Sequence, residues 1–306
     1  MNRRDFNRLL TGAAIGPSLL AAHAQSAAVP MTSASKTSRF SVMLWTIDRG
    51  IPFERSMEIV AAAGYQGIEL IRESAKWSPA ETRHIKKKLS GLGLTIDSMA
   101  CIGAGLADPA GADRLATQLT KRIAVAKDLE CPQIILTSGM RMGGLTRETQ
   151  HAACIENLKR VADLVSKNDM ELVIEPIDLL EDKFAYLNSV AEGFDIVRAV
   201  GSPNIKVLYD FYHEQRAAGN LIDKLERNIE WVGLVHIADV PGRHEPGTGE
   251  IDYRNIYRKL AELNYDRFIT MEYFPTTDPM ESLKTARLVA LQAPLTPSAP
   301  YKLGSA

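Results

Sequence analysis

Residues 171–210 of the chain read ELVIEPIDLLEDKFAYLNSVAEGFDIVRAVGSPNIKVLYD. The stretch begins and ends with a short, continuous apolar run, and residues 189–200 between the runs have the apolar spacing of a helix. Strands that are buried on both faces contain such continuous runs, which is typical of parallel sheets covered by helices. The stretch therefore predicts a strand–helix–strand unit with two parallel strands, each ending in an acidic residue.

The same alternation continues in both directions, from residue 40 to residue 291. Pro79 and Pro279 stand at first-turn positions of helical segments, and Gly64 and Gly91 stand at the ends of such segments. Eight strand–helix units in about 250 residues predict an α/β fold, a single (β/α)8 TIM barrel. A doubly wound sheet is the alternative, but no G-x-G-x-x-G follows the first strand. The expected strands are 40–45, 67–71, 94–100, 133–138, 171–175, 205–210, 232–238 and 268–272, and the expected helices are 53–63, 79–89, 112–129, 149–168, 189–200, 221–229, 253–263 and 279–291.

The composition is that of a globular protein. Of the 306 residues, 45% are apolar and 24% are charged, which excludes a disordered or fibrous chain. The net charge is −1, so the chain lacks the basic surface that binding to nucleic acid requires. The three cysteines have no C-x-x-C or zinc-ribbon spacing, and we expect no disulfide framework.

The first 24 residues have the pattern of an export signal. Arg3 and Arg4 precede a short apolar stretch that ends at Ala22-His23-Ala24, which predicts a cleaved signal peptide of the twin-arginine (Tat) route. The stretch is shorter than the about 20 residues of a transmembrane helix, so we expect no membrane insertion of the mature chain. Cleavage would change the net charge from −1 to −3, because this segment carries three arginines and one aspartate. We expect a periplasmic protein that meets the Tat translocon during export, with a signal peptide over 1–24, a flexible leader over 25–38, the barrel over 39–292 and a loose Pro-rich tail over 293–306.

Four residues able to bind a metal close four successive strands of the expected barrel. They are Glu175, Asp210, His236 and Glu272. The carboxyl ends of barrel strands converge on the face that holds the active site, so we expect these side chains to meet. One strand-end carboxylate alone is more often a helix cap, but four such residues on successive strands favour a metal site. Three carboxylates and one imidazole suit Mn²⁺ best, with Mg²⁺, Co²⁺ or Zn²⁺ as alternatives.

Three segments then connect the chain with a known family. They are YDFYH at 209–213, HIADVPGRHEPGTGEIDY at 236–253 and MEY at 271–273. On these segments the chain resembles the hydroxypyruvate isomerase family, one of the xylose-isomerase-like barrels (AP endonuclease family 2 type), which also include ketose 3-epimerases. The resemblance extends over residues 40–291. It implies metal ligation by Glu175, Asp210, His236 and Glu272, and it makes Glu175 and Glu272 the catalytic acid–base pair.

The resemblance also implies which residues contact the substrate. His213, Arg243 and Glu181 match positions that contact substrate oxygens in the family. Arg243 is alternatively an exposed loop arginine. From its position at the end of the first strand, Trp45 is expected to form an apolar wall of the pocket, with a core tryptophan as the alternative. Glu69, near the end of the second strand, is expected to make a structural pairing rather than to join the site.

The expected activity is isomerisation or epimerisation of a sugar or hydroxy-carbonyl compound by enediolate proton transfer, of the aldose–ketose type. Removing a C–H proton beside a carbonyl needs a Lewis acid at the oxygens and positioned acid and base groups. A metal-dependent lyase or dehydratase on the same barrel and a non-catalytic periplasmic sugar-binding barrel are the alternatives. The sequence determines neither the identity of the substrate nor the oligomeric state, and a homo-oligomer is compatible with it.

Overall fold

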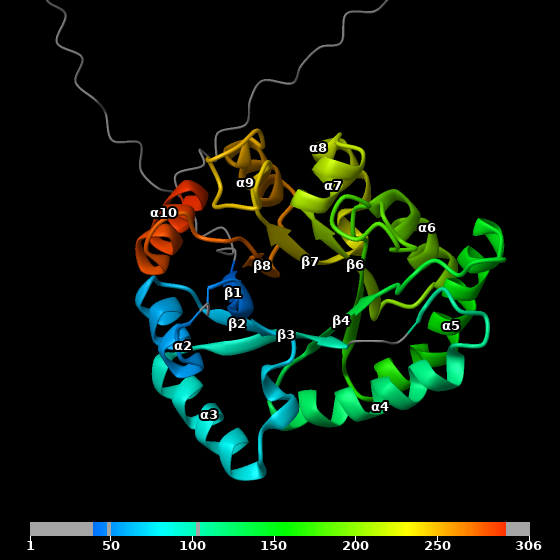
Figure 1. Ribbon diagram of the computed structural model, residues 1–306, viewed down its shortest axis with the longest axis horizontal. Helices are drawn as coiled ribbons and strands as arrows, with labels where there is room; N and C mark the ends of the chain where they lie inside the picture. The colour runs from blue at the N-terminus through cyan, green and yellow to red at the C-terminus, as the bar shows by residue number, and fades with distance from the viewer. Residues whose placement is uncertain (1–38, 48–49, 102–104, 292–306) are drawn as a thin grey trace, which may run out of the picture. The chain divides into compact units, whose positions relative to one another are not determined.

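The barrel is closed. The computed structural model describes residues 39–47, 50–101 and 105–291. Eight parallel strands pair in chain order from β1 to β8, and β8 pairs with β1, while helices surround the strands (Figure 1). This arrangement confirms the predicted (β/α)8 fold. The predicted signal peptide, leader and tail fall on 1–38 and 292–306, which lie outside the described residues.

The strands match the predicted ones closely, and β5 and β6 have the predicted bounds. The strands are β1 (Arg39–Met43), β2 (Gly67–Leu70), β3 (Thr95–Cys101), β4 (Gln133–Thr137), β5 (Glu171–Glu175), β6 (Ile205–Asp210), β7 (Val232–Ile237) and β8 (Phe268–Met271).

The helices form the outer layer, and none of those described is both long and apolar enough to cross a membrane. The helix α7, directly after β6, was not predicted. The helices are η1 (Leu44–Thr46), α2 (Phe53–Ala62), η2 (Glu73–Lys76), α3 (Pro79–Leu92), α4 (Ala112–Asp128), α5 (Arg147–Lys167), α6 (Val190–Val200), α7 (Phe211–Ala217), α8 (Leu221–Asn228), η3 (Ile229–Trp231), α9 (Tyr253–Glu262) and α10 (Pro279–Leu291).

Most of the other predicted boundaries differ from the observed ones by one or two residues. Two of the differences have a clear local reason. Helix α3 continues past Gly91 to Leu92, because Gly93 takes the left-handed conformation (φ 68°) that ends the helix. Trp45 lies in η1 and not in a strand, because β1 ends at Met43. There the Thr46 hydroxyl donates to the Met43 carbonyl (2.7 Å) and turns the chain.

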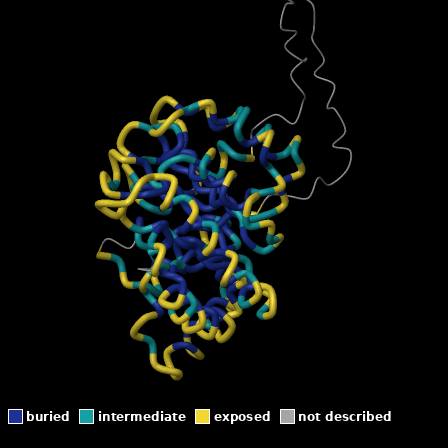
Figure 2. Tube along the Cα trace, turned by 90° about the vertical axis from the view of Figure 1, so that its right-hand side faces the viewer, coloured by how far each residue is buried: buried dark blue, intermediate teal, exposed yellow. Residues whose placement is uncertain are grey.

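Buried residues fill the centre of the barrel and exposed ones lie on the outer helices and loops (Figure 2). Within the barrel, Val173, Leu208 and Leu234 pack together in a small apolar cluster with Ile135. The first three precede Glu175, Asp210 and His236 by two residues each. Because side chains two apart on a strand share a face, the cluster is the layer on which the polar strand ends rest.

Candidate active site

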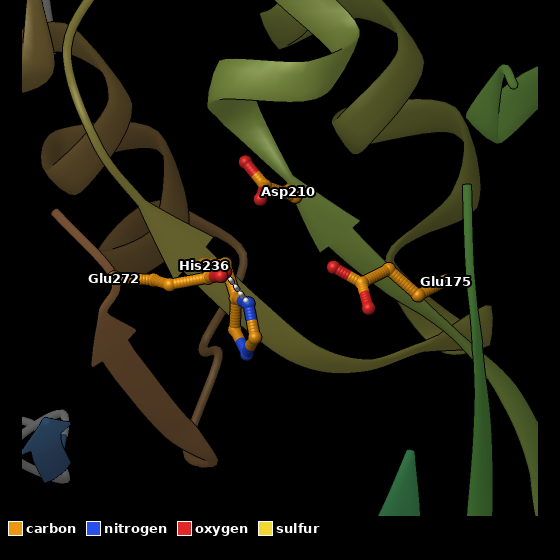
Figure 3. Close-up of side chains that lie close together, drawn as sticks. All are labelled: Glu175, Asp210, His236 and Glu272. Carbon is orange, nitrogen blue, oxygen red and sulfur yellow. Dashed lines mark hydrogen bonds and ion pairs between the residues drawn. The ribbon is translucent and has the colours of Figure 1, made fainter. Parts of the chain in front are cut away.

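Glu175, Asp210, His236 and Glu272 meet at the carboxyl end of the barrel. Glu175 and Asp210 end β5 and β6, His236 is the next-to-last residue of β7, and Glu272 follows β8. One oxygen or nitrogen atom of each lies within 4.8 Å of those of the other three, and all four residues are buried. Figure 3 shows Glu175 and Glu272 reaching toward His236 from opposite sides. The structure thus brings together the four predicted ligands.

The side chain of Glu272 is held by two cationic partners. Its Oε2 lies 2.7 Å from Nδ1 of His236, and its Oε1 contacts the guanidinium of Arg243. Burial opposes ionisation of this carboxyl, but the charge of Arg243 and the hydrogen bond from His236 lower the pKa of Glu272 to about 2. Glu272 is therefore a carboxylate at neutral pH.

Glu175 has a different environment although it belongs to the same cluster. Burial, and after it the charge of Glu272, raise the pKa of Glu175 to about 7. Two neighbouring carboxyl groups with pKa values pushed apart are typical of an acid and a base that work together.

His236 is fully buried between two carboxylates. Its Nδ1 faces Glu272, and its Nε2 lies 3.0 Å from Oε2 of Glu69 on β2. Burial opposes a charge on the ring, but Glu69 and Glu272 together raise the pKa of His236 well above its usual range. Glu69 thus joins the site as well as making the expected structural pairing, which is with Ser98.

The donor set of the cluster fits a divalent cation. Three carboxylates and one imidazole, all buried, converge on one small volume. Such a concentration of negative charge is costly unless cations balance it, and oxygen-rich sets with one imidazole suit hard or borderline divalent ions. The cluster therefore suggests a divalent metal held by Glu175, Asp210, His236 and Glu272.

His213 lies beside the cluster on α7. Asp210 caps this helix, because its Oδ1 accepts the backbone amides of Tyr212 (2.7 Å) and His213 (3.2 Å). The His213 ring lies between two acids, with Nδ1 2.7 Å from Asp178 and Nε2 3.5 Å from Asp210. Burial alone would lower the pKa of His213, but these two acids raise it. Asp178 was not identified from the sequence, because its loop contains no motif or periodic pattern that indicates a functional residue.

Arg243 lies inside the site, with only 6% of its surface exposed, so the exposed-loop alternative is wrong. Its guanidinium pairs with Glu272 and lies 3.6 Å from Asp210 and 3.4 Å from Glu181. The backbone amide of Phe274 donates to the Arg243 carbonyl (2.8 Å), which fixes the residue in the left-handed conformation (φ 57°).

A cavity of about 320 Å³ opens over this cluster. The ring of Trp45 packs edge-on against Phe274, with 5.3 Å between ring centres, and forms part of the wall. The structure therefore places every predicted substrate-contacting residue at one cavity. Its lining includes Trp45, Glu175, Glu181, His213, Arg243 and Glu272.

Comparison with known proteins agrees with this arrangement. Residues 57–289 match the family described as Xylose isomerase-like TIM barrel. The chain belongs to this family. Hydroxypyruvate isomerase of Escherichia coli K12 is 29% identical over 251 residues, which cover 80% of the chain and 97% of that relative. The 2-oxo-tetronate isomerase of Cupriavidus necator is 30% identical over 228 residues, covering 70% and 84%.

Solved structures extend the similarity to the three-dimensional fold of the family. An AP endonuclease of family 2 from Brucella melitensis superposes with a TM-score of 0.74 at 25% identity, covering 81% of the chain and 97% of that structure. An L-ribulose 3-epimerase superposes with a TM-score of 0.70 at 22% identity, covering 84% and 96%, which shows the shared fold. The named sequence relatives are isomerases, which confirms the predicted enzyme class.

Proposed function

We propose that this xylose-isomerase-like barrel is a metal-dependent isomerase of small hydroxy-carbonyl compounds. The observation that carries the proposal is the pair of buried glutamates, Glu175 and Glu272, that belong to the candidate metal cluster and line one cavity. Two relatives bear the names hydroxypyruvate isomerase and 2-oxo-tetronate isomerase. Hydroxypyruvate and other hydroxylated 2-oxo acids are therefore the first substrates to test, followed by free ketoses.

The cofactor that we propose is Mn²⁺, held by Glu175, Asp210, His236 and Glu272. When bound, a divalent cation supplies positive charge that stabilises the oxyanion formed as a C–H proton leaves. Asp210 also caps α7, so the same side chain fixes the position of His213 relative to the cluster.

The two glutamates carry the proton transfer in this proposal. One glutamate, as a carboxylate, removes the C–H proton beside the carbonyl, and the other, in its protonated form, delivers a proton to the former carbonyl carbon. The hydroxyl proton moves to the other oxygen of the enediolate, so that atoms and charge balance. Each positioned acid or base is typically worth about 10² to 10⁴ in rate. His213 donates a hydrogen bond to a substrate oxygen, while Arg243 and Glu181 orient the hydroxyl groups. The apolar ring of Trp45 limits the access of water.

The proposal is tested with protein loaded with Mn²⁺ in D₂O, with hydroxypyruvate and a panel of ketoses followed by NMR. We expect deuterium at the carbon beside the carbonyl together with an isomeric product, and we expect EDTA to abolish both. Re-addition of Mn²⁺ should restore them. Loss of water from the substrate would instead indicate a dehydratase, and binding of a sugar without any turnover would indicate a binding protein.

We also propose that the protein acts in the periplasm after export by the twin-arginine route. The support is the sequence of residues 1–24, in which Arg3 and Arg4 precede the apolar stretch and an A-x-A site. We expect the mature protein in the periplasmic fraction to begin at Gln25, and we expect R3K/R4K to keep the chain inside the cell. N-terminal sequencing of both fractions checks this, and equal export of the two chains would contradict it.

A further inference from the structure

We propose that Glu69 is a positioning residue that orients His236 for metal binding. In this arrangement Glu69 accepts the Nε2–H of His236, so that Nδ1 is the nitrogen presented to the metal. The inference rests on the proposed metal centre. The two side chains are 3.0 Å apart, and neither has any exposed surface. They belong to β2 and β7, which are separated by β1 and β8 in the closed barrel.

The carboxylate of Glu69 is itself fixed by its neighbouring strand. The Ser98 hydroxyl donates a hydrogen bond of 2.6 Å to Oε2, the same oxygen that faces His236. The register of β2 against β3 shifts between Ile68 and Glu69, so that Glu69 pairs with Ser98 and not with Asp97. Such irregularities in strand pairing re-aim side chains beside active sites. The shift explains how Ser98 reaches the carboxylate.

The cost of burying Glu69 argues for a role beyond packing. Its second oxygen, Oε1, is buried and has no hydrogen-bond partner in the described part of the chain. Burying a carboxylate with one oxygen unsatisfied is costly, and replacing a whole buried pair of charged groups by apolar residues is often neutral or favourable for stability. The presence of a carboxylate at this buried position is explained if Glu69 orients the imidazole ring of His236.

The other ring nitrogen of His236, Nδ1, points toward the ligand cluster, as this role requires. Nδ1 lies 2.7 Å from Oε2 of Glu272, inside the ligand cluster. Histidines that bind metals usually donate their second ring N–H to a carboxylate, which fixes the tautomer and the ring orientation. Losing that second partner typically costs about 10- to 100-fold in metal affinity.

Asp97 on β3 provides a matched control. It is a buried carboxyl inside the same barrel and has one unpartnered oxygen among the described residues, like Glu69. Its other oxygen accepts hydrogen bonds from Ser41 (2.6 Å) and Thr270 (3.2 Å), and it makes no described contact with His236. A change at Asp97 therefore reports the effect of altering a neighbouring buried acid while the contact between Glu69 and His236 is kept.

The test is the dissociation constant for Mn²⁺, measured by titration calorimetry on the full-length protein and on the E69Q and D97N variants. We expect E69Q to bind Mn²⁺ about 10- to 100-fold more weakly, and we expect D97N to stay close to the unchanged protein. Equal affinity in E69Q and the unchanged protein overturns the inference, as does an equal loss in D97N. Thermal melts without metal show whether each variant is folded.

A second variant keeps the inference testable if E69Q does not fold. S98A removes the hydroxyl that holds Glu69 and leaves the carboxylate in place, so we expect a several-fold loss of Mn²⁺ affinity. Unchanged affinity in S98A would then overturn the inference. If the unchanged protein binds no divalent metal, the proposed function fails as well. Tight binding by both the unchanged protein and E69Q contradicts only the role of Glu69.

Discussion

Asp178 connects three parts of the site through one side chain. Its Oδ2 lies 2.7 Å from Nδ1 of His213, and its Oδ1 accepts the backbone amides of Leu180 (2.9 Å) and Glu181 (3.1 Å). Arg216 lies 3.4 Å from the same carboxylate. The residue therefore sets the ring orientation of His213 and the course of the chain that carries Glu181.

We expect D178N to lower kcat/KM by about 10- to 100-fold, because a hydrogen bond to a charged group is worth about 1.5–3 kcal/mol. Steady-state kinetics on whichever substrate is turned over checks this. D195N, on the exposed surface of α6, is the control and should keep full activity. Unchanged kcat/KM in D178N would mean that His213 does not need this partner.

At the level of elements, the loop between β7 and α9 is built around one buried aspartate. The carboxylate of Asp239 accepts the backbone amides of Val240, Gly247 and Gly249 at 2.9 Å each, and that of Ile251 at 3.1 Å. The two glycine amides are thus occupied within the loop. Arg243 is carried by this loop, so the order of the loop determines the position of Arg243 in the site.

Gly249 has no room for a side chain. A Cβ there would lie 2.0 Å from the carbonyl oxygen of Val240, within a loop that cannot move without breaking the bonds to Asp239. We expect G249A to lower the free energy of unfolding by about 1–3 kcal/mol, as overpacking does, and to reduce activity by displacing Arg243.

The control for this change is G91A on α3. A Cβ at Gly91 meets no atom within 4 Å, and alanine favours a helix over glycine by roughly 0.5–1 kcal/mol. Denaturant unfolding should therefore show a lower free energy of unfolding for G249A than for the unchanged protein, and a higher one for G91A. A G249A variant as stable and as active as the unchanged protein would contradict the assigned role of the loop.

At the scale of the whole barrel, the interior has an apolar half and a polar half. Ile135, Val173, Leu208 and Leu234 fill the side formed by β4 to β7. The side formed by β1, β2, β3 and β8 instead buries two polar groups. Hydrogen bonds join Ser41, Asp97 and Thr270 in one group, and Glu69 and Ser98 in the other. Burial, and after it the charge of Glu69, raise the pKa of Asp97 from 3.8 to about 8.

This shift predicts a pH dependence of stability. Because the pKa of Asp97 is higher in the folded protein than in the unfolded chain, the folded state holds a proton that the unfolded chain loses, and stability falls as the pH rises between these values. We expect the melting temperature of the unchanged protein to fall relative to that of D97N from about pH 4 to about pH 8. A difference that stays constant over this range would contradict the assignment.

The sequence was sufficient for the parts of the fold that depend on local patterns. Continuous apolar runs located the strands, and acidic or histidine residues at strand ends located the cluster. The sequence could not reveal α7, because this helix begins directly after β6 and depends on Asp210 as its cap. Asp210 was already identified as a ligand, and capping is its second role. Glu69 and Asp178 depend on contacts between distant segments, one through a shift in strand register and one through a loop. Such contacts leave no periodic pattern in a single sequence.

The central claim is that Glu175 and Glu272 transfer the proton. The most direct measurement is the exchange of solvent deuterium into hydroxypyruvate by E175Q, E272Q and the unchanged protein, followed by NMR at Mn²⁺ concentrations that saturate each variant. Saturation separates the loss of the acid or base from the loss of a metal ligand. We expect the unchanged protein to exchange the C–H proton and each variant to lose at least about 10² in exchange rate. Exchange at the unchanged rate in both variants would contradict the claim.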